Sequence, residues 1–324
     1  MPSPSTALST QRPDLAGSMM EYDLAMGRQG FIAPQVLPVI EVAKQAGNFG
    51  KIPIEQLLKT RDTARAPGAP YARGQFTFLP ATYACEEHGA EEPIDDREAA
   101  MYRDYFDAEQ IAAQRAYDAV LRNAEIRAAT AIFDATAWAA YTTGITEEWD
   151  TPDAAVPLTD VETAAQAVWA QCGLWPNALI INRKVFRNLR NVEQIVDRLK
   201  YQGFVDVRPQ MVTRAAMAAC FDLDYVIVAD CPKDSAAEGQ DTTIANIWSD
   251  EYAMVCRVAT TQDIREPCIG RTFHWGEDGS QIGGLIESYR DESVRSDVVR
   301  VRHDVDEVVL YVEAGHLLSN VTTI

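Results

Sequence analysis

The sequence lacks the features that mark membrane, secreted and nucleic-acid-binding proteins. No apolar run approaches the roughly 18 residues of a membrane-spanning helix, and the first residues have neither the basic start nor the apolar stretch of a secretory signal. Basic residues are scarce, since 29 Lys and Arg stand against 48 Asp and Glu and give a net charge of −19. Because phosphate binding needs a basic surface, this balance argues against a protein that grips nucleic acid or an anionic membrane. We therefore expect a protein that stays in the compartment where it is made.

Sequence motifs of catalysis and metal binding are missing as well. The chain has no GxxxxGKS/T, GxGxxG, GxSxG, HExxH or CxxC motif. Its six cysteines include several within apolar runs, so we expect reduced, buried thiols. The stretch from Cys85 to His88 contains metal-ligand side chains, but structural zinc sites normally use four well-spaced ligands. We predict no catalytic residue, no metal and no cofactor.

The composition is that of a globular protein. Hydrophobic residues make up 47% and charged residues 24% of the sequence, a composition that excludes wholesale disorder. The length of 324 residues is enough for about two domains. Apolar residues recur at helical spacing from Asp107 to Trp138 without Pro or Gly, which predicts one helix about 48 Å long. From about residue 160 to 270 helical and strand patterns alternate, and one of them predicts a continuous helix over 184–203. Two strands follow, with a predicted turn near His303 to Asp306.

Two segments near the N-terminus are poorly suited to folding alone. Residues 1–46 contain several Pro and Ser, and their isolated apolar side chains are too few to offset the entropy of ordering. Residues 47–94 predict a long two-stranded hairpin, in which Phe76 and Phe78 alternate with polar residues. A hairpin of this length is only marginally stable by itself. We expect both segments to lie on a neighbouring chain; the alternative for the arm is a tail folded back on its own domain.

The tip of this hairpin is rich in arginine. Arg61, Arg65 and Arg73 lie between the two predicted strands. They are either solvated loop charges or partners for carboxylates on an acidic neighbour, because the planar guanidinium suits interface ion pairs.

Several stretches have sequences typical of one protein family. The predicted elements also follow the order of that family: an arm, a hairpin, a long helix, an α/β region and closing strands. The stretches are YACEEHGAEEPIDDRE, NAEIRAATAIFDATAW, LIINRKVFRNLRNVEQIVDRLKY, VTRAAMAACFDLDYVIVADCPKDSAAEG, IANIWSDEYAMVCRV, RTFHW and VVRVRHDVDEVVLYVEAGHLL. Over essentially its whole length the chain resembles the major capsid proteins of tailed bacteriophages, which have the Hong Kong 97-type fold. The resemblance implies an α+β protein with an N-terminal arm, an extended β-hairpin, a long spine helix with a peripheral β-sheet, and an axial α/β domain.

Each part of the chain acquires a role from this resemblance. Residues 1–46 would form the N-terminal arm and 47–94 the hairpin, called the E-loop. Residues 95–159 would form the peripheral domain with the spine helix. Residues 160–285 would form the axial domain, whose loops meet at the centre of each ring, and 286–324 the return strands of the peripheral domain.

The resemblance also implies partners and a location. The chain would assemble with itself into hexamers and pentamers of an icosahedral shell, without a membrane, in the host cytoplasm and then in the virion. Packaged double-stranded DNA would be enclosed without sequence-specific binding, because an acidic inner surface confines DNA without holding it. A separate scaffolding protein and a portal are implied, and a decoration protein is compatible. The expected inter-subunit contacts are Tyr22, Phe31, Arg61, Arg65, Arg73, Phe76 and Phe78.

Two other functions fit the same sequence. An encapsulin-type compartment would keep the fold and enclose a cargo enzyme, although the long Pro- and Ser-containing arm favours the viral shell. An acidic cytoplasmic α/β enzyme would instead be a small oligomer with a pocket of perturbed carboxylates or thiols.

Overall fold

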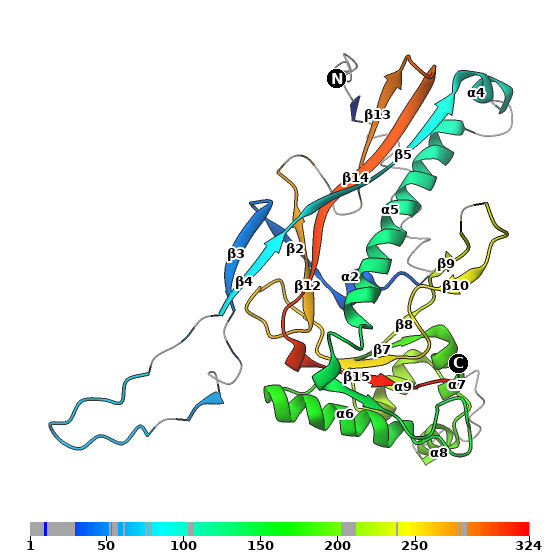
Figure 1. Ribbon diagram of the computed structural model, residues 1–324. Helices are drawn as coiled ribbons and strands as arrows, with labels where there is room; N and C mark the ends of the chain where they lie inside the picture. The colour runs from blue at the N-terminus through cyan, green and yellow to red at the C-terminus, as the bar shows by residue number, and fades with distance from the viewer. Residues whose placement is uncertain are drawn as a thin grey trace.

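The computed structural model describes residues 10–11, 30–51, 53, 58–60, 62–74, 77, 79–102, 107–201, 212–237, 239–277, 279 and 284–323. They form an α+β molecule in which two β-sheets organise two halves, with a hairpin projecting from one side (Figure 1). None of the described helices has the length and hydrophobicity needed to cross a membrane.

A five-stranded sheet forms the core of the half that is lower in Figure 1. Residues of the interior strand β7 (Ala178–Asn182) alternate between two hydrophobic clusters, so both faces of the strand are buried. One cluster packs against helices α6 (Pro157–Cys172) and α9 (Arg214–Phe221), and the other against the C-terminal end of the long helix. The order is β6–β15–β11–β7–β8, with the further bounds Thr142–Gly144 for β6, Gly315–Ser319 for β15, Ala253–Cys256 for β11 and Tyr225–Ala229 for β8.

A six-stranded sheet supports the elongated half. Its longest strand, β14 (Ser296–Val309), pairs antiparallel with β13 (Leu285–Asp291), β5 (Glu86–Asp95) and β12 (Gly270–Trp275). The sheet is completed by β2 (Val39–Val42), parallel to β12, and by β1 (Thr10–Gln11), antiparallel to β13. The helix α4 (Asp96–Tyr102) follows β5 directly.

The long helix α5 extends from Ala108 to Ile132 and lies along β14 and β5 (Figure 1). Asp107 caps its first turn, since the side chain accepts hydrogen bonds from the backbone amides of residues 109 and 110. The prediction of a helix continuing to Trp138 is wrong. The helix ends at Ile132, where the chain turns back on itself. The turn is held by the buried Trp138, whose Nε1 donates a hydrogen bond to the Ala131 carbonyl at 3.2 Å. At 25 residues the helix is about 37 Å long.

The segment that follows residue 29 is packed on its own chain. The short helix α2 (Ala33–Val36) is held by Glu125 of α5, whose carboxylate accepts hydrogen bonds from the amides of Ile32 and Ala33, both at 2.9 Å, and from Trp248 Nε1 at 2.6 Å. Burial raises the pKa of this carboxyl, and the three donors act in the opposite direction. The expectation that the whole arm over 1–46 needs a neighbouring chain is therefore wrong for residues 30–42, and also for residues 10–11, which pair with β13 of the same chain.

Gly30 lets the chain enter this packed segment. Its φ of +85° lies in the left-handed region, and a Cβ atom there would approach within 2.5 Å of Asp230 Cβ. Only glycine fits at this crossing of the two backbones.

The hairpin is shorter than predicted. Strands β3 (Ala46–Lys51) and β4 (Leu79–Ala84) pair antiparallel, with residue 46 opposite 84 and 51 opposite 79. Residues 86–95, expected in the hairpin, instead form β5 of the six-stranded sheet, because their carboxylates face arginines of β14.

Four other expectations about elements need correction. The predicted helix over 184–203 is two helices, α7 (Arg183–Leu189) and α8 (Glu193–Tyr201), separated by a turn at 190–192. No turn lies at 303–306, where β14 continues because its polar residues pair across the sheet with β5 and β12. Strand β12, expected in the axial domain, lies in the six-stranded sheet, whereas β15, expected among the return strands, lies in the five-stranded sheet.

The expectation about the cysteines is confirmed, since all six are free and buried.

Replacing the buried carboxylate of Glu125 should destabilise the folded chain. Glu125→Ala leaves three buried donors without an acceptor, and we expect a loss of about 3 kcal/mol in the free energy of unfolding, measured by urea denaturation. Glu98→Ala, an exposed change on α4, is the control and should stay within about 0.5 kcal/mol of the wild type. Equal denaturation midpoints for the two variants would contradict this account of α2.

Candidate assembly surfaces

The base of the hairpin is fixed to the body of the same chain. Tyr83 stacks on Phe273 of β12 with ring centroids 4.8 Å apart, and Phe49 lies 5.5 Å from the same ring. The amide of Ala84 donates to Asp306 Oδ2 at 2.8 Å, and Lys51 Nζ donates to the Leu310 carbonyl. Two aromatic side chains and two polar contacts therefore set the direction in which the hairpin leaves the molecule.

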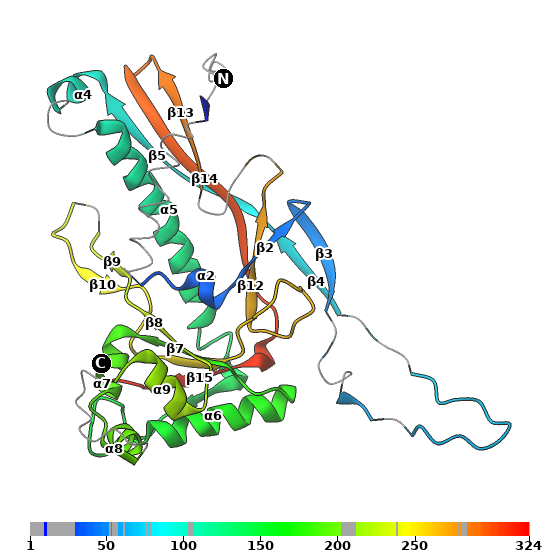
Figure 2. The same ribbon diagram turned by 180° about the vertical axis from the view of Figure 1, so that it is seen from behind.

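The tip of the hairpin extends away from that body (Figure 2). Over residues 62–74 almost every side chain is exposed, and Tyr71 is 71% accessible. Arg65 gives the tip local order, because its Nε donates to the Ala69 carbonyl at 2.6 Å and its guanidinium lies 4.6 Å from the Tyr71 ring centroid. An exposed aromatic side chain that an arginine holds in place is typical of a protein contact site.

The seven predicted contact residues have different positions. Arg65 and Arg73 are exposed on the tip, so the structure leaves them available for contacts. Phe31 packs at the edge of the core near α5, with the Arg122 guanidinium 6.0 Å from its ring centroid. The other four, Tyr22, Arg61, Phe76 and Phe78, lie outside the described residues.

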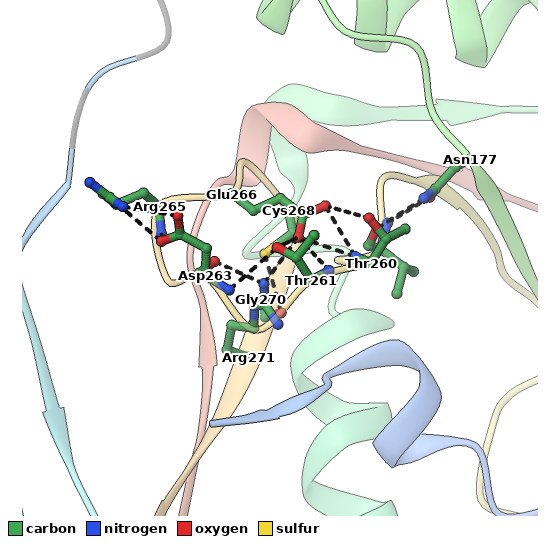
Figure 3. Close-up of polar contacts among 10 residues, drawn as sticks. Asn177, Thr260, Thr261, Asp263, Arg265, Glu266, Cys268, Gly270 and Arg271 are labelled. Atoms are coloured by element: carbon green, nitrogen blue, oxygen red, sulfur yellow. Dashed lines mark hydrogen bonds and ion pairs between the residues drawn. The ribbon is translucent and has the colours of Figure 1, made fainter. Parts of the chain in front are cut away.

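A polar loop stands beside the hairpin, between β11 and β12 (Figure 3). The Glu266 carboxylate accepts hydrogen bonds from the amides and hydroxyls of Thr260 and Thr261, at 2.7–3.2 Å. It also pairs at 3.3 Å with Arg271, whose side chain is fully buried. At the far end of the loop, Asp263 holds the exposed Arg265 through two contacts of 3.1 Å.

These donors hold Glu266 in its charged form. Burial acts to raise the pKa of this carboxyl, but the hydrogen bonds from Thr260 and Thr261 outweigh it and lower the pKa to about 2. The carboxylate thus fixes the loop and presents Arg265 to solvent on the side of the molecule that carries the hairpin (Figures 1 and 3).

The outer face of the six-stranded sheet is a network of ion pairs. Arg300 and Arg302 of β14 both reach Glu287 of β13, which is 6% exposed, with Arg300 Nε at 3.1 Å and Arg302 Nε at 3.6 Å from its Oε2. Arg300 also lies 3.6 Å from Glu91 of β5. Basic residues of this acidic chain are therefore largely neutralised here, within the subunit.

Two tryptophans are exposed at the C-terminal end of α6. Trp169 and Trp175 are 49% and 53% accessible and stack with ring centroids 5.8 Å apart. Arg257 Nη1 donates to the Trp175 carbonyl at 3.3 Å, which fixes the loop after the helix. Large aromatic side chains at this exposure are typical of protein contact sites.

Basic side chains gather at α7. Arg183, Lys184, Arg187 and Arg190 line an open cleft of about 550 Å³ together with Asp230. Arg183 lies 3.7 Å from Asp230 and Lys184 lies 2.6 Å from Asp250, whereas the Arg187 guanidinium forms no ion pair with any described residue.

Sequence reasoning missed two features of the structure. Nothing in the helical pattern distinguishes the buried Glu125 from an exposed glutamate, since its three partners come from distant segments. The Trp169 and Trp175 pair had a usable signal, because tryptophan at the end of an otherwise amphipathic helix is costly to expose. Among the described residues, no group of three or more His, Cys, Asp or Glu is placed to hold a metal ion.

The Glu266 loop should lose stability in acid. Because the pKa of Glu266 is about 2 in the folded chain and near 4.5 in the unfolded chain, its contribution is complete above pH 4.5 and falls as the pH approaches 2. Glu266→Gln should therefore lower the free energy of unfolding by about 2 kcal/mol at pH 7 and by less at pH 3. Urea denaturation at both pH values measures this, with Glu98→Gln as the control. A loss that is the same at both pH values would contradict the role of the charge.

Known proteins share this fold along nearly the whole chain. The major capsid protein of Burkholderia phage BcepMu is 24% identical over 303 residues, which is 90% of this chain and 91% of that protein. A phage-related protein from Bordetella bronchiseptica RB50 superposes with a TM-score of 0.69 at 19% identity, over 97% of this chain and 98% of that one. The capsid of cyanophage P-SCSP1u gives a TM-score of 0.56 at 12% identity, over 88% and 86% of the two chains. No family model matches the sequence.

An encapsulin also has this fold. The SrpI encapsulin of Synechococcus elongatus PCC 7942 superposes with a TM-score of 0.51 at 10% identity, over 90% of this chain and 87% of that chain. Its sequence similarity is far lower than that of the BcepMu protein, so it supports the fold and not the biology. The resemblance predicted from the sequence is confirmed: the chain has the Hong Kong 97-type capsid fold, and its sequence is similar to that of a phage major capsid protein over nine-tenths of both chains.

Proposed function

We propose that the chain is the major capsid subunit of a tailed phage and assembles with itself into hexamers and pentamers of an icosahedral shell around double-stranded DNA. The observation that carries this proposal is the match to a phage major capsid protein over nine-tenths of both chains. Such homology implies a structural and not an enzymatic role.

The parts of the fold acquire roles in this proposal. The hairpin formed by β3 and β4 is the E-loop, α5 is the spine helix, and the six-stranded sheet belongs to the peripheral domain. The five-stranded sheet with α6 to α9 is the axial domain, whose loops surround the centre of each ring. This division follows the two sheets and replaces the boundary at residue 285, since β12 and β15 lie on the other side of it.

The exposed hairpin tip supports assembly through unlike surfaces. The base of the hairpin is fixed to its own chain, whereas Tyr71 and Arg73 at the tip remain exposed. A contact between this tip and a different surface of the next copy is heterologous, and such contacts close into rings when the rotation permits.

The charge of the chain suits an enclosed polyanion. With a net charge of −19, a shell of such subunits would confine DNA without binding it tightly, because tight binding needs cations that replace the counterions of DNA. A scaffolding protein to guide assembly and a portal for DNA entry are the further partners that this function requires.

Particle mass tests the proposal. The purified 35.8 kDa chain should form megadalton particles with icosahedral symmetry in electron microscopy and native mass measurement.

Tyr71→Ser together with Arg73→Ser should reduce particle yield at least tenfold, because both side chains are exposed and contact sites concentrate energy in few residues. The melting temperature of the free subunit should stay unchanged.

A surface change outside the hairpin is the matched control. Glu98→Gln, exposed on α4, should assemble like the wild type. A wild-type chain that stops at a dimer or tetramer would overturn the shell, and a cargo enzyme in place of DNA inside particles isolated from the natural source would favour a compartment.

A further inference from the structure

The axial half of the subunit has two unlike edges on opposite sides. The C-terminal end of α6 is on the hairpin side, since Leu58 of the hairpin segment packs against Gly173, the residue that ends the helix. Helix α7 lies on the other side in both views (Figures 1 and 2). A ring of identical subunits in head-to-tail contact joins two different surfaces of neighbouring copies.

One edge is aromatic and carries a carboxylate. We call it the tryptophan edge and define it by Glu162, Trp169 and Trp175. Glu162 and Trp169 are both exposed on α6, and Trp175 follows the helix and stacks on Trp169. About half of each tryptophan side chain stays accessible to solvent in the single chain.

The other edge is basic. We call it the α7 surface and define it by Arg183, Lys184 and Arg187, which are all exposed. The carboxylates of Asp230 and Asp250 reach the first two, but the guanidinium of Arg187 is not paired with any described residue. In a chain with a net charge of −19, a cluster of three cations on one short helix is a local exception.

The chemistry of the two edges is complementary. Arginine guanidinium groups stack on tryptophan faces by cation–π attraction, which strengthens when the contact excludes water. The Glu162 carboxylate adds an opposite charge for a second cation. Trp and Arg are also the residues most enriched among those that dominate binding energy at protein interfaces.

We propose that the tryptophan edge of one subunit docks on the α7 surface of the next copy in the ring. This contact rests on the proposed shell function and names the surfaces that close the ring in the axial domain. It is separate from the contact made by the hairpin tip, which reaches farther from the body (Figure 1).

Tryptophan fluorescence tests the docking without any mutation. Of the six tryptophans, Trp138, Trp149 and Trp248 are fully buried within the subunit and Trp275 is half-buried, so acrylamide reaches mainly Trp169 and Trp175 in free subunits. Assembly should lower the acrylamide quenching constant at least twofold. Particles that form with an unchanged quenching constant would overturn this inference and leave the shell function intact, whereas absence of particles would count against the shell itself.

Paired variants then locate the partner surface. Trp169→Ser with Trp175→Ser, and separately Arg183→Glu with Arg187→Glu, should each raise the critical concentration for assembly at least tenfold. Trp169→Phe with Trp175→Phe keeps the aromatic faces and should raise it less. Circular dichroism and melting of the free subunits check that each variant is folded. Normal assembly of the folded arginine variant would exclude the α7 surface as the partner and overturn the proposal.

Discussion

The register of β14 is the constraint on which the elongated half depends. Val299 and Val301 face α5, while the arginines between and after them, Arg300 and Arg302, face carboxylates of β5 and β13. Because side chains alternate along a strand, a slip of one residue would place two guanidinium groups against the helix and two valines in the ion-pair network. The cost of burying unpaired charge therefore fixes one register. With 14 residues, β14 is about 46 Å long, comparable with the helix it supports, and together they form one rigid support.

This support determines where the hairpin goes. Ala84 of β4 bonds to Asp306 of β14, and Tyr83 stacks on Phe273 of β12, which pairs with β14. The base of the hairpin is therefore as rigid as the sheet, although its tip contacts little of its own chain. A projecting segment on a rigid base presents the same geometry in every copy, which reduces the entropy lost when copies associate. Glu125 has the corresponding role inside the subunit, because it joins α2, α5 and the loop before β11.

The sequence predicted the fold through its strongest local patterns and missed features that depend on distant partners. Strand β7 was predictable because a short apolar run between two helices is buried on both faces. Strand β14 was divided in two because His303, Asp304 and Asp306 look like turn residues, although cross-strand pairing continues through them. The acidic residues 86–92 have no local sign of their partners, because some of them face Arg300 and Arg302 from more than 200 positions away. The end of α5 was overestimated because the apolar spacing continues to Trp138 after the helix has stopped. The sequence contains six tryptophans, and which of them are exposed depends on the tertiary packing.

Hydrogen exchange at the hairpin tip tests most directly the central claim that this subunit finishes its burial on other copies. Within residues 62–74 few amides have hydrogen-bond partners in the chain, so they should exchange rapidly in free subunits, while the amides of β14 stay protected. In assembled particles the account predicts exchange at the tip at least tenfold slower, with no change in β14. Exchange at the tip that is equally fast before and after assembly would contradict it.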